Sequence, residues 1–293
     1  MRFHKPVMVD EVIRYLQIEK GDIVVDCTVG TAGHSYEIAK LILPQGRLIA
    51  IDQDEEVLAF TRKRLKEFKN YQIVHQNFKN IDLILEELGL KKGEIDGFLF
   101  DLGVSSFQLD SPERGFSFRF SGYLDMRMNR ENSVTAFDLV NNLTAEELER
   151  IFREYSQERY ARRIAKAIIK AREKETISTT IQLADIIKRA VPTRTSIHPA
   201  TRVFQALRIV VNQELESLSS ALKKAVEFLK PGGRICVISF HSGEDRIVKN
   251  EFRHFAQSRL LNIITKKPVL PSAQEITANP RVRSAKLRVG ERI

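Results

Sequence analysis

The chain has 293 residues, of which 43% are hydrophobic, and a formal net charge of +9. This composition excludes a disordered chain, and no run of about 18 apolar residues predicts a transmembrane helix. The first residues lack the apolar segment of a signal peptide and only two cysteines occur, so we expect a cytoplasmic protein with reduced thiols and no membrane partner. No Cys and His cluster has metal-ligand spacing, so we predict no metal site.

The first third of the chain alternates between expected strands and helices. We expect helices at 7–16, 34–43, 54–68 and 79–89, and strands at 23–27, 47–52, 72–76 and 95–101. Such alternation predicts a parallel α/β sheet, in which ligands bind beyond the carboxyl ends of the strands.

A turn of small residues follows the first expected strand. It contains Gly30 and Gly33, and the next strand ends in Asp52. This pairing is typical of sheets that bind a nucleoside cofactor, because turn N–H groups face the ligand and the acid accepts from ribose hydroxyls. Thr28 and Ala32 stand where a pyrophosphate would require glycine, which favours S-adenosylmethionine over NAD. A purely structural turn is the third alternative.

The alternation stops at 108–133, a segment rich in Gly, Ser, Asp, Arg and Phe that we expect to be a long ordered loop. Helices follow, and a capping box at Thr144 predicts the start of one that reaches about Ser156. Further helices are expected near 160–171, at 179–191 with Thr179 and Gln182 as its capping pair, and, as one long element, at 199–229.

Strand pattern returns at Arg234–His241, and two late runs at 261–269 and 284–290 could close the sheet as an antiparallel hairpin. We therefore predict a discontinuous sheet domain formed by residues 1–110 and 206–293. An inserted helical domain over 111–205 would recognise the substrate.

The positive charge is uneven along the chain. Acids outnumber bases over 1–110, whereas bases greatly outnumber acids over 159–208 and 246–293. A solvated basic face would explain one such segment, but two of them beside a cofactor fold favour RNA or DNA as the partner.

Several motifs in order carry a family resemblance. They include Asp26-x-Thr28-x-Gly30-x-Ala32-Gly33-His34-Ser35, Asp101-Leu-Gly-Val-Ser-Ser106, Arg114-Gly-Phe-Ser-Phe118, His198-Pro-Ala-Thr-Arg202 and Asn279-Pro-Arg281. With them the chain resembles, over nearly its full length, the bacterial small-subunit rRNA cytosine-N4 methyltransferases of the MraW/RsmH type. The resemblance implies a Rossmann-like S-adenosylmethionine-dependent methyltransferase sheet with an inserted all-helical domain. It also implies methylation of the N4 amine of a cytidine in the decoding region of 16S rRNA, on the small ribosomal subunit.

The resemblance also implies the cofactor site, which comprises Ala32, Gly33, His34, Asp52, Phe78, Asp101 and Gln108. Asp101 is the candidate catalytic residue, because amine methyltransferases often place Asp/Asn-Pro-Pro-aromatic after the fourth strand. This chain keeps the acid but lacks the prolines and the aromatic residue, so the catalytic assignment stays open. His241, at another strand end, is a second candidate on the substrate side, with a structural role as its alternative.

The expected RNA contacts fall into three groups. The loop supplies Arg114, Phe116, Phe118, Phe120 and Arg127, which suit stacking on a splayed base and phosphate contact, or else form a hydrophobic plug between domains. A basic helix face supplies Arg162, Lys166 and Lys170. The C-terminal part supplies Arg281, Arg283 and Arg288.

Two residues depart from the family pattern, since Ala32 and Gly243 replace its usual Gly and Leu. Neither change removes a polar group.

Three alternatives to an rRNA methyltransferase stay open. They are a methyltransferase for a small molecule or protein, a non-catalytic rRNA-binding assembly factor and, third, an NAD oxidoreductase. The sequence leaves a homodimer open.

Overall fold

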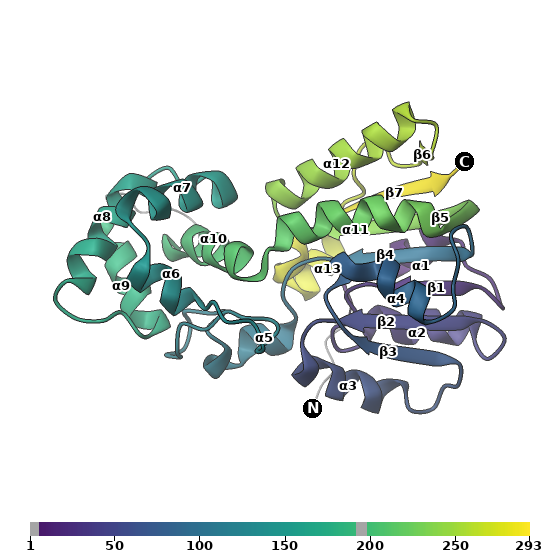
Figure 1. Ribbon diagram of the computed structural model, residues 1–293, viewed down its shortest axis with the longest axis horizontal. Helices are drawn as coiled ribbons and strands as arrows, with labels where there is room; N and C mark the ends of the chain where they lie inside the picture. Colours follow the sequence, from purple (N-terminus) through teal and green to yellow (C-terminus); the bar gives the residue numbers. More distant parts are fainter. Residues whose placement is uncertain (1–5, 192–197) are drawn as a thin grey trace. The chain divides into compact units, whose positions relative to one another are not determined.

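The computed structural model describes residues 6–191 and 198–293, which form two compact units (Figure 1). The sheet unit contains the chain up to Gly103 and again from Leu215, and the helical unit comprises Val104–Glu214. The helical unit therefore begins earlier and ends later than the predicted insertion at 111–205. Each unit has its own hydrophobic core.

The sheet unit contains seven strands in the order β3-β2-β1-β4-β5-β7-β6. Their bounds are β1 Ile23–Asp26, β2 Arg47–Asp52, β3 Tyr71–His75, β4 Ile95–Asp101, β5 Leu229–Ser239, β6 Leu261–Ile263 and β7 Lys286–Arg292. The first five strands pair in parallel, and β7 pairs antiparallel with both β5 and β6. The predicted antiparallel closure is thus confirmed.

Helices cover both faces of this sheet. One core cluster joins the sheet to α4 (Ile81–Glu87), α11 (Glu214–Phe228) and α12 (Ser242–Gln257). The other cluster joins it to α1 (Val9–Leu16), α2 (Gly33–Ile42) and α3 (Glu55–Leu65). Because side chains alternate along a strand, Phe98 and Phe100 pack on the first face and Leu99 on the second. Burial on both faces explains why the inner strands are continuously apolar.

The helical unit contains α5 (Ser106–Asp110), α6 (Ala136–Asn142), α7 (Ala145–Ser156), α8 (Ala161–Arg172), α9 (Thr180–Ala190) and α10 (Ala200–Asn212). The capping boxes at Thr144 and Thr179 are confirmed, and Thr135 forms another that the sequence analysis missed. Within the described parts of the chain, no helix combines the length and apolar character needed to cross a membrane.

The prediction of one helix over 199–229 is wrong. Gln213 has a left-handed φ of 50°, and this residue separates α10 from α11. Next to the break, Asn212 is buried and its amide contacts the loop, donating to the Met126 carbonyl and accepting from the Met128 N–H at 2.8 and 2.7 Å. Long-range bonds of this kind leave no local sequence signal.

Candidate functional site

Three parallel strands end in carboxylates at one edge of the sheet: Asp26 on β1, Asp52 on β2 and Asp101 on β4. Asp26 is buried and accepts from the Ser35 hydroxyl at 2.6 Å and the Thr28 N–H at 3.2 Å. Burial raises the pKa of Asp26 to about 6. This acid therefore ties the turn after β1 to the first turn of α2.

Asp52 holds the same turn from the neighbouring strand. One carboxylate oxygen accepts from the Gly30 N–H at 2.9 Å and the other from the Asp54 N–H at 3.0 Å. Burial raises the pKa of Asp52 to about 7, against the lowering effect of these two bonds. A carboxylate oxygen has more than one acceptor position. Asp52 can therefore bind the turn and still accept from the hydroxyls of a ribose.

The turn itself requires unusual backbone conformations. Gly30 and Ala32 have left-handed φ values of 52° and 59°. A Cβ at Gly30 would meet only the Thr28 carbonyl oxygen, at 3.8 Å, so this position is open. At Gly33 a Cβ would lie 2.9 Å from Cβ of Pro6, so glycine is needed for close packing there. The open side at Gly30 fits a ligand that approaches the backbone, as predicted for the cofactor.

His34 and Asp101 form a buried pair beside the turn. His34 Nε2 lies 2.8 Å from the Val7 carbonyl oxygen, so this nitrogen donates and Nδ1 carries a lone pair. That Nδ1 lies 3.5 Å from Oδ2 of Asp101. Burial lowers the pKa of His34 to about 4. Burial and then the charges of Asp26 and Glu244 raise the pKa of Asp101 well above its usual range. These directions favour an uncharged pair with its proton on Asp101.

The other oxygen of Asp101 is the strongest sign of a ligand. Oδ1 is buried, and it has no hydrogen-bond partner in the described part of the chain. A buried polar atom without a partner destabilises the fold by about 1–3 kcal/mol. A bound group that donates to Oδ1 would remove this cost. Thr28, which the sequence analysis treated only as a missing glycine, fixes Asp101 because its hydroxyl oxygen accepts from the Asp101 N–H at 2.6 Å.

Phe78 follows β3 at the same edge of the sheet. It is half-buried and packs edge-to-face on Phe100 of β4, with 5.8 Å between the ring centroids. Gln108 belongs instead to the helical unit, where its side-chain oxygen caps α5 by accepting from the Ser105 N–H at 2.9 Å. The cofactor contacts of both residues stay predictions.

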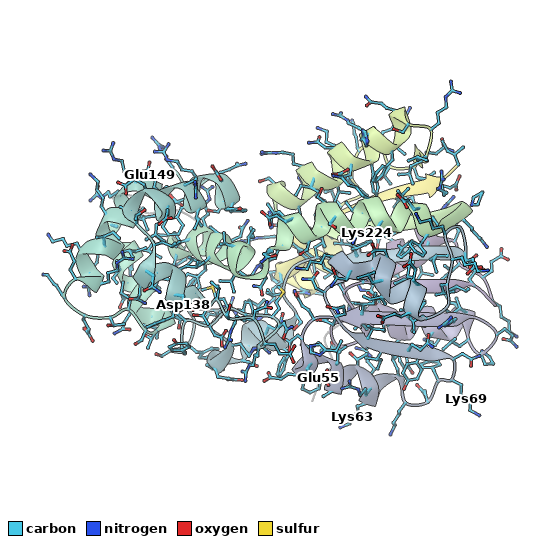
Figure 2. All side chains as sticks on the ribbon, in the orientation of Figure 1. Glu55, Lys63, Lys69, Asp138, Glu149 and Lys224 are labelled. Carbon is cyan, nitrogen blue, oxygen red and sulfur yellow. The ribbon has the colours of Figure 1, made fainter. Side chains whose placement is uncertain are left out.

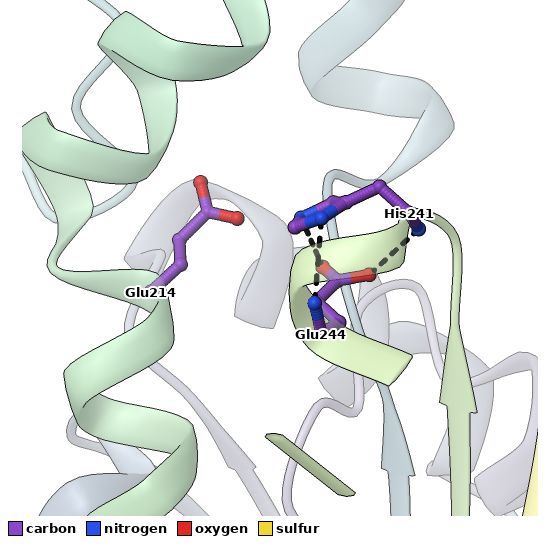
Figure 3. Close-up of side chains that lie close together, drawn as sticks. All are labelled: Glu214, His241 and Glu244. Atoms are coloured by element: carbon purple, nitrogen blue, oxygen red, sulfur yellow. Dashed lines mark hydrogen bonds and ion pairs between the residues drawn. The ribbon is translucent and has the colours of Figure 1, made fainter. Parts of the chain in front are cut away.

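His241 has a role that the sequence analysis treated as the alternative. Figure 3 shows it at the start of α12, where Nδ1 accepts from the N–H groups of Gly243 and Glu244 at 3.1 and 3.4 Å. Glu244 reciprocates by accepting from the Phe240 and His241 N–H groups at 2.7 and 3.2 Å. A Cβ at Gly243 would lie 3.0 Å from Nδ1, so glycine leaves room for this cap. The geometry gives His241 Nδ1 a capping role, and a substrate-side role for this residue stays a prediction.

Two arginines of the loop are used within the loop. Arg114 is fully buried, and its guanidinium donates to the carbonyls of Arg127 and Met128 at 2.9 and 3.1 Å. Arg127 forms a two-pronged pair with Asp125 and also donates to the carbonyls of Arg130 and Asn132. The prediction that Arg114 contacts RNA is corrected accordingly, because a buried side chain faces no solvent. Arg127 is half-buried and mainly shapes the loop.

The loop phenylalanines divide in the same way. Phe116 is buried in the core of the helical unit, which corrects its assignment to the RNA surface. Phe118 is half-buried and stacks on His198, with 4.6 Å between centroids. Phe120, which the sequence analysis also placed in this group, is 52% exposed and is the better candidate for stacking on a base.

The predicted RNA contacts on α8 and at 281–283 are exposed. Arg162, Lys166 and Lys170 line one side of α8, while Ile164 and Ile168 on its other side pack in the core. Arg281 and Arg283 are exposed in the sheet unit. Both groups retain the solvent access that a phosphate contact needs.

Comparisons with known proteins agree with this geometry. A family model described as the MraW methylase family matches residues 1–293. Proteins named ribosomal RNA small subunit methyltransferase H from Halothermothrix orenii and Clostridioides difficile are 50% and 45% identical. The matches cover 99% and 100% of this chain and 98% and 100% of the relatives.

A solved structure supports the fold. The crystal structure of an rRNA-methylase candidate from Clostridium thermocellum matches with a TM-score of 0.51 at 15% identity, covering 99% of this chain and 100% of that one. At this identity the likeness shows the Rossmann-like α/β fold alone.

The family decides between the two predicted cofactors, because a methylase needs a methyl donor and NAD supplies none. The donor is S-adenosylmethionine, which the turn and Asp52 fit. Over its whole length the chain belongs to the MraW methylase family, and it is a methyltransferase.

Proposed function

We propose that this protein methylates the N4 amine of a cytidine in the decoding region of 16S rRNA, on the small ribosomal subunit in the cytoplasm. The relatives' names carry the small-subunit rRNA part of this proposal. The cytosine-N4 and decoding-region parts come from the motif resemblance. The observation that carries the chemistry is the buried, unpartnered oxygen of Asp101 at the carboxyl edge of the sheet.

The proposed reaction needs a hydrogen-bond acceptor beside the amine. The exocyclic amine of cytosine is a weak nucleophile, because its lone pair is delocalised into the ring. S-adenosylmethionine supplies the electrophilic methyl group when bound. Asp101 Oδ1 would accept a hydrogen bond from the amine, orient its nitrogen and stabilise the positive charge that develops there. Water would take the proton that the methylated nitrogen then releases. Because Oδ2 faces His34, the pair can hold one proton while Oδ1 stays an acceptor.

Substrate recognition would use exposed cations and Phe120. The cations of α8 and the arginines near the C-terminus suit phosphate contacts, which set affinity and orientation rather than sequence choice. Phe120 offers an exposed ring for a base that has left its stack. A methyltransferase for a small molecule would need neither feature.

The test is the destination of a labelled methyl group. Purified protein would be incubated with labelled S-adenosylmethionine and small subunits that lack the modification, with naked 16S rRNA in parallel. We expect label in the rRNA, and more of it on the subunits than on naked rRNA. Label in ribosomal protein would favour the protein-methylation alternative. No transfer despite tight cofactor binding would favour the small-molecule alternative, and failure to bind S-adenosylmethionine would favour the assembly-factor alternative.

A further inference from the structure

A basic pocket lies in the sheet unit on the face covered by α12. Its volume is about 380 Å³. Lys249 and Arg253 of α12, Arg288 of β7 and the segment 265–268 line it, with Ile263 of β6. The predicted RNA contacts include one of these residues, Arg288, and the predicted cofactor site includes none.

The charge of this pocket is not balanced from within. Five of its lining residues are Lys or Arg and none is acidic. The nearby carboxylate of Asp245 is already used, because it accepts from Arg288 Nε at 2.7 Å and lies 3.3 Å from Lys286 Nζ. Arg288 is buried, so this pair forms a fixed base under the pocket.

The other four cations stand at the rim. Lys249, Arg253, Lys266 and Lys267 are exposed, and none forms an ion pair within the described residues. Thr265 is buried and its hydroxyl oxygen accepts from the Val289 N–H at 2.9 Å, which fixes the start of the segment that carries the two lysines. Cations gathered without a counter-ion repel one another, and an anion relieves this repulsion.

The strand register relates this pocket to the carboxyl edge. Arg288 is paired with Val237 of β5, and Val237 is paired with Phe100, the residue before Asp101. Two strand spacings of about 4.8 Å place the Arg288 backbone roughly 10 Å from that of Phe100. A polyanion that delivers a nucleotide to the carboxyl edge can therefore also reach the pocket.

We propose that this pocket binds backbone phosphates of the substrate RNA, as an anchoring site separate from the methyl-transfer site. The inference rests on the proposed RNA substrate. Four exposed cations along one rim suit consecutive phosphodiesters better than one small anion, and Ile263 and Pro268 offer apolar contact to a ribose. The pocket contributes to the affinity for RNA, whereas the cofactor binds at the carboxyl edge of the sheet.

The test compares two double variants of equal charge change. Lys266→Gln with Lys267→Gln removes two rim cations. The control, Lys63→Gln with Lys69→Gln, removes two exposed lysines elsewhere in the sheet unit (Figure 2). Binding of small subunits lacking the modification would be measured across a salt series, and S-adenosylmethionine binding by calorimetry. We expect the pocket variant to bind subunits on the order of tenfold more weakly at physiological salt. Its log–log salt slope should be shallower by about 1.4–1.8, at 0.7–0.9 per lost phosphate contact.

The outcomes separate this inference from the proposed function. Equal losses in both variants, or an unchanged slope in the pocket variant, would overturn the pocket as an RNA site. Inorganic phosphate that saturates the pocket without competing with subunits would overturn it too, and would leave a small-anion site. If the wild-type protein binds no subunits, the proposed function itself fails. S-adenosylmethionine binding should be the same in all three proteins.

Discussion

Replacing Asn212 tests how the helical unit is held together. The Asn212 amide donates to the carbonyls of Met126 and Arg208 and accepts from the Met128 N–H. Alanine removes the donor for the Met126 carbonyl and the acceptor for the Met128 N–H, both in buried residues. Each lost buried partner costs about 1–3 kcal/mol, so Asn212→Ala should destabilise this unit by roughly 2–6 kcal/mol.

Asn212→Asp is the sharper substitution, because it keeps the shape of the side chain. Its carboxylate can still accept from Met128, but its second oxygen faces the carbonyls of Met126 and Arg208 in place of an N–H donor. Burial and these two oxygens should raise the pKa of the introduced carboxyl, since only its protonated form donates. A folded-state pKa above the unfolded value gives stability that is present at low pH and lost as pH rises through the folded pKa. The loss amounts to up to about 1.4 kcal/mol per pH unit.

Amide hydrogen exchange measured by mass spectrometry reports on each unit separately. Peptides from Val104–Glu214 should lose protection in Asn212→Asp at pH 8 at least as much as in the alanine variant, and recover part of it at pH 5. Asn129→Asp is the matched control, because the Asn129 side-chain oxygen only accepts, from the Glu131 N–H at 2.9 Å, and a carboxylate can do the same. Wild-type protection of Asn212→Asp at pH 8, or lower protection at pH 5 than at pH 8, would refute this reasoning.

Three further predictions follow from the site and from α8. Ala32→Gly should change the free energy of unfolding by less than about 1 kcal/mol, because relief of its left-handed strain offsets the lost buried methyl. The control Ala39→Gly, inside α2, should lower the free energy of unfolding by about 2 kcal/mol, and equal losses for the two variants in urea unfolding would contradict this. Because the folded-state pKa of Asp52 is raised to about 7, its stabilising contribution is present below about pH 4 and lost as pH rises through 7. The free energy of unfolding should therefore fall less between pH 5 and 8 in Asp52→Asn than in the wild type, and parallel pH profiles of this free energy would disprove it. The double variant Lys166→Gln, Lys170→Gln should weaken subunit binding and flatten its salt dependence without changing S-adenosylmethionine binding. A salt slope equal to that of the wild type would show that α8 is not part of the RNA-binding surface.

The sheet was predictable because its signals are local. Continuous apolar runs mark strands buried on both faces, and the carboxylates at their ends follow directly, so the positions of Asp52 and Asp101 could be predicted before the structure. The capping boxes at Thr144 and Thr179 were equally local. What these patterns describe is a backbone segment and its immediate ends.

The errors concern side chains with long-range partners. Arg114 and an exposed phosphate-binding arginine look alike in sequence, and only the carbonyls of Arg127 and Met128 show that it is buried. The break at Gln213 contains neither glycine nor proline, so periodicity alone extends the helix through it. The basic pocket combines residues from α12, β6 and β7, which charge counting along the chain cannot bring together.

The most direct test of the central claim is to identify the methylated nucleoside. Small subunits lacking the modification would be incubated with the protein and S-adenosylmethionine, and their 16S rRNA digested and separated by liquid chromatography with mass spectrometry. The account predicts N4-methylcytidine with the wild type and a large loss of it with Asp101→Asn. The isomer 5-methylcytidine, or full N4 methylation by Asp101→Asn, would contradict the claim that Asp101 holds the cytosine amine for methyl transfer.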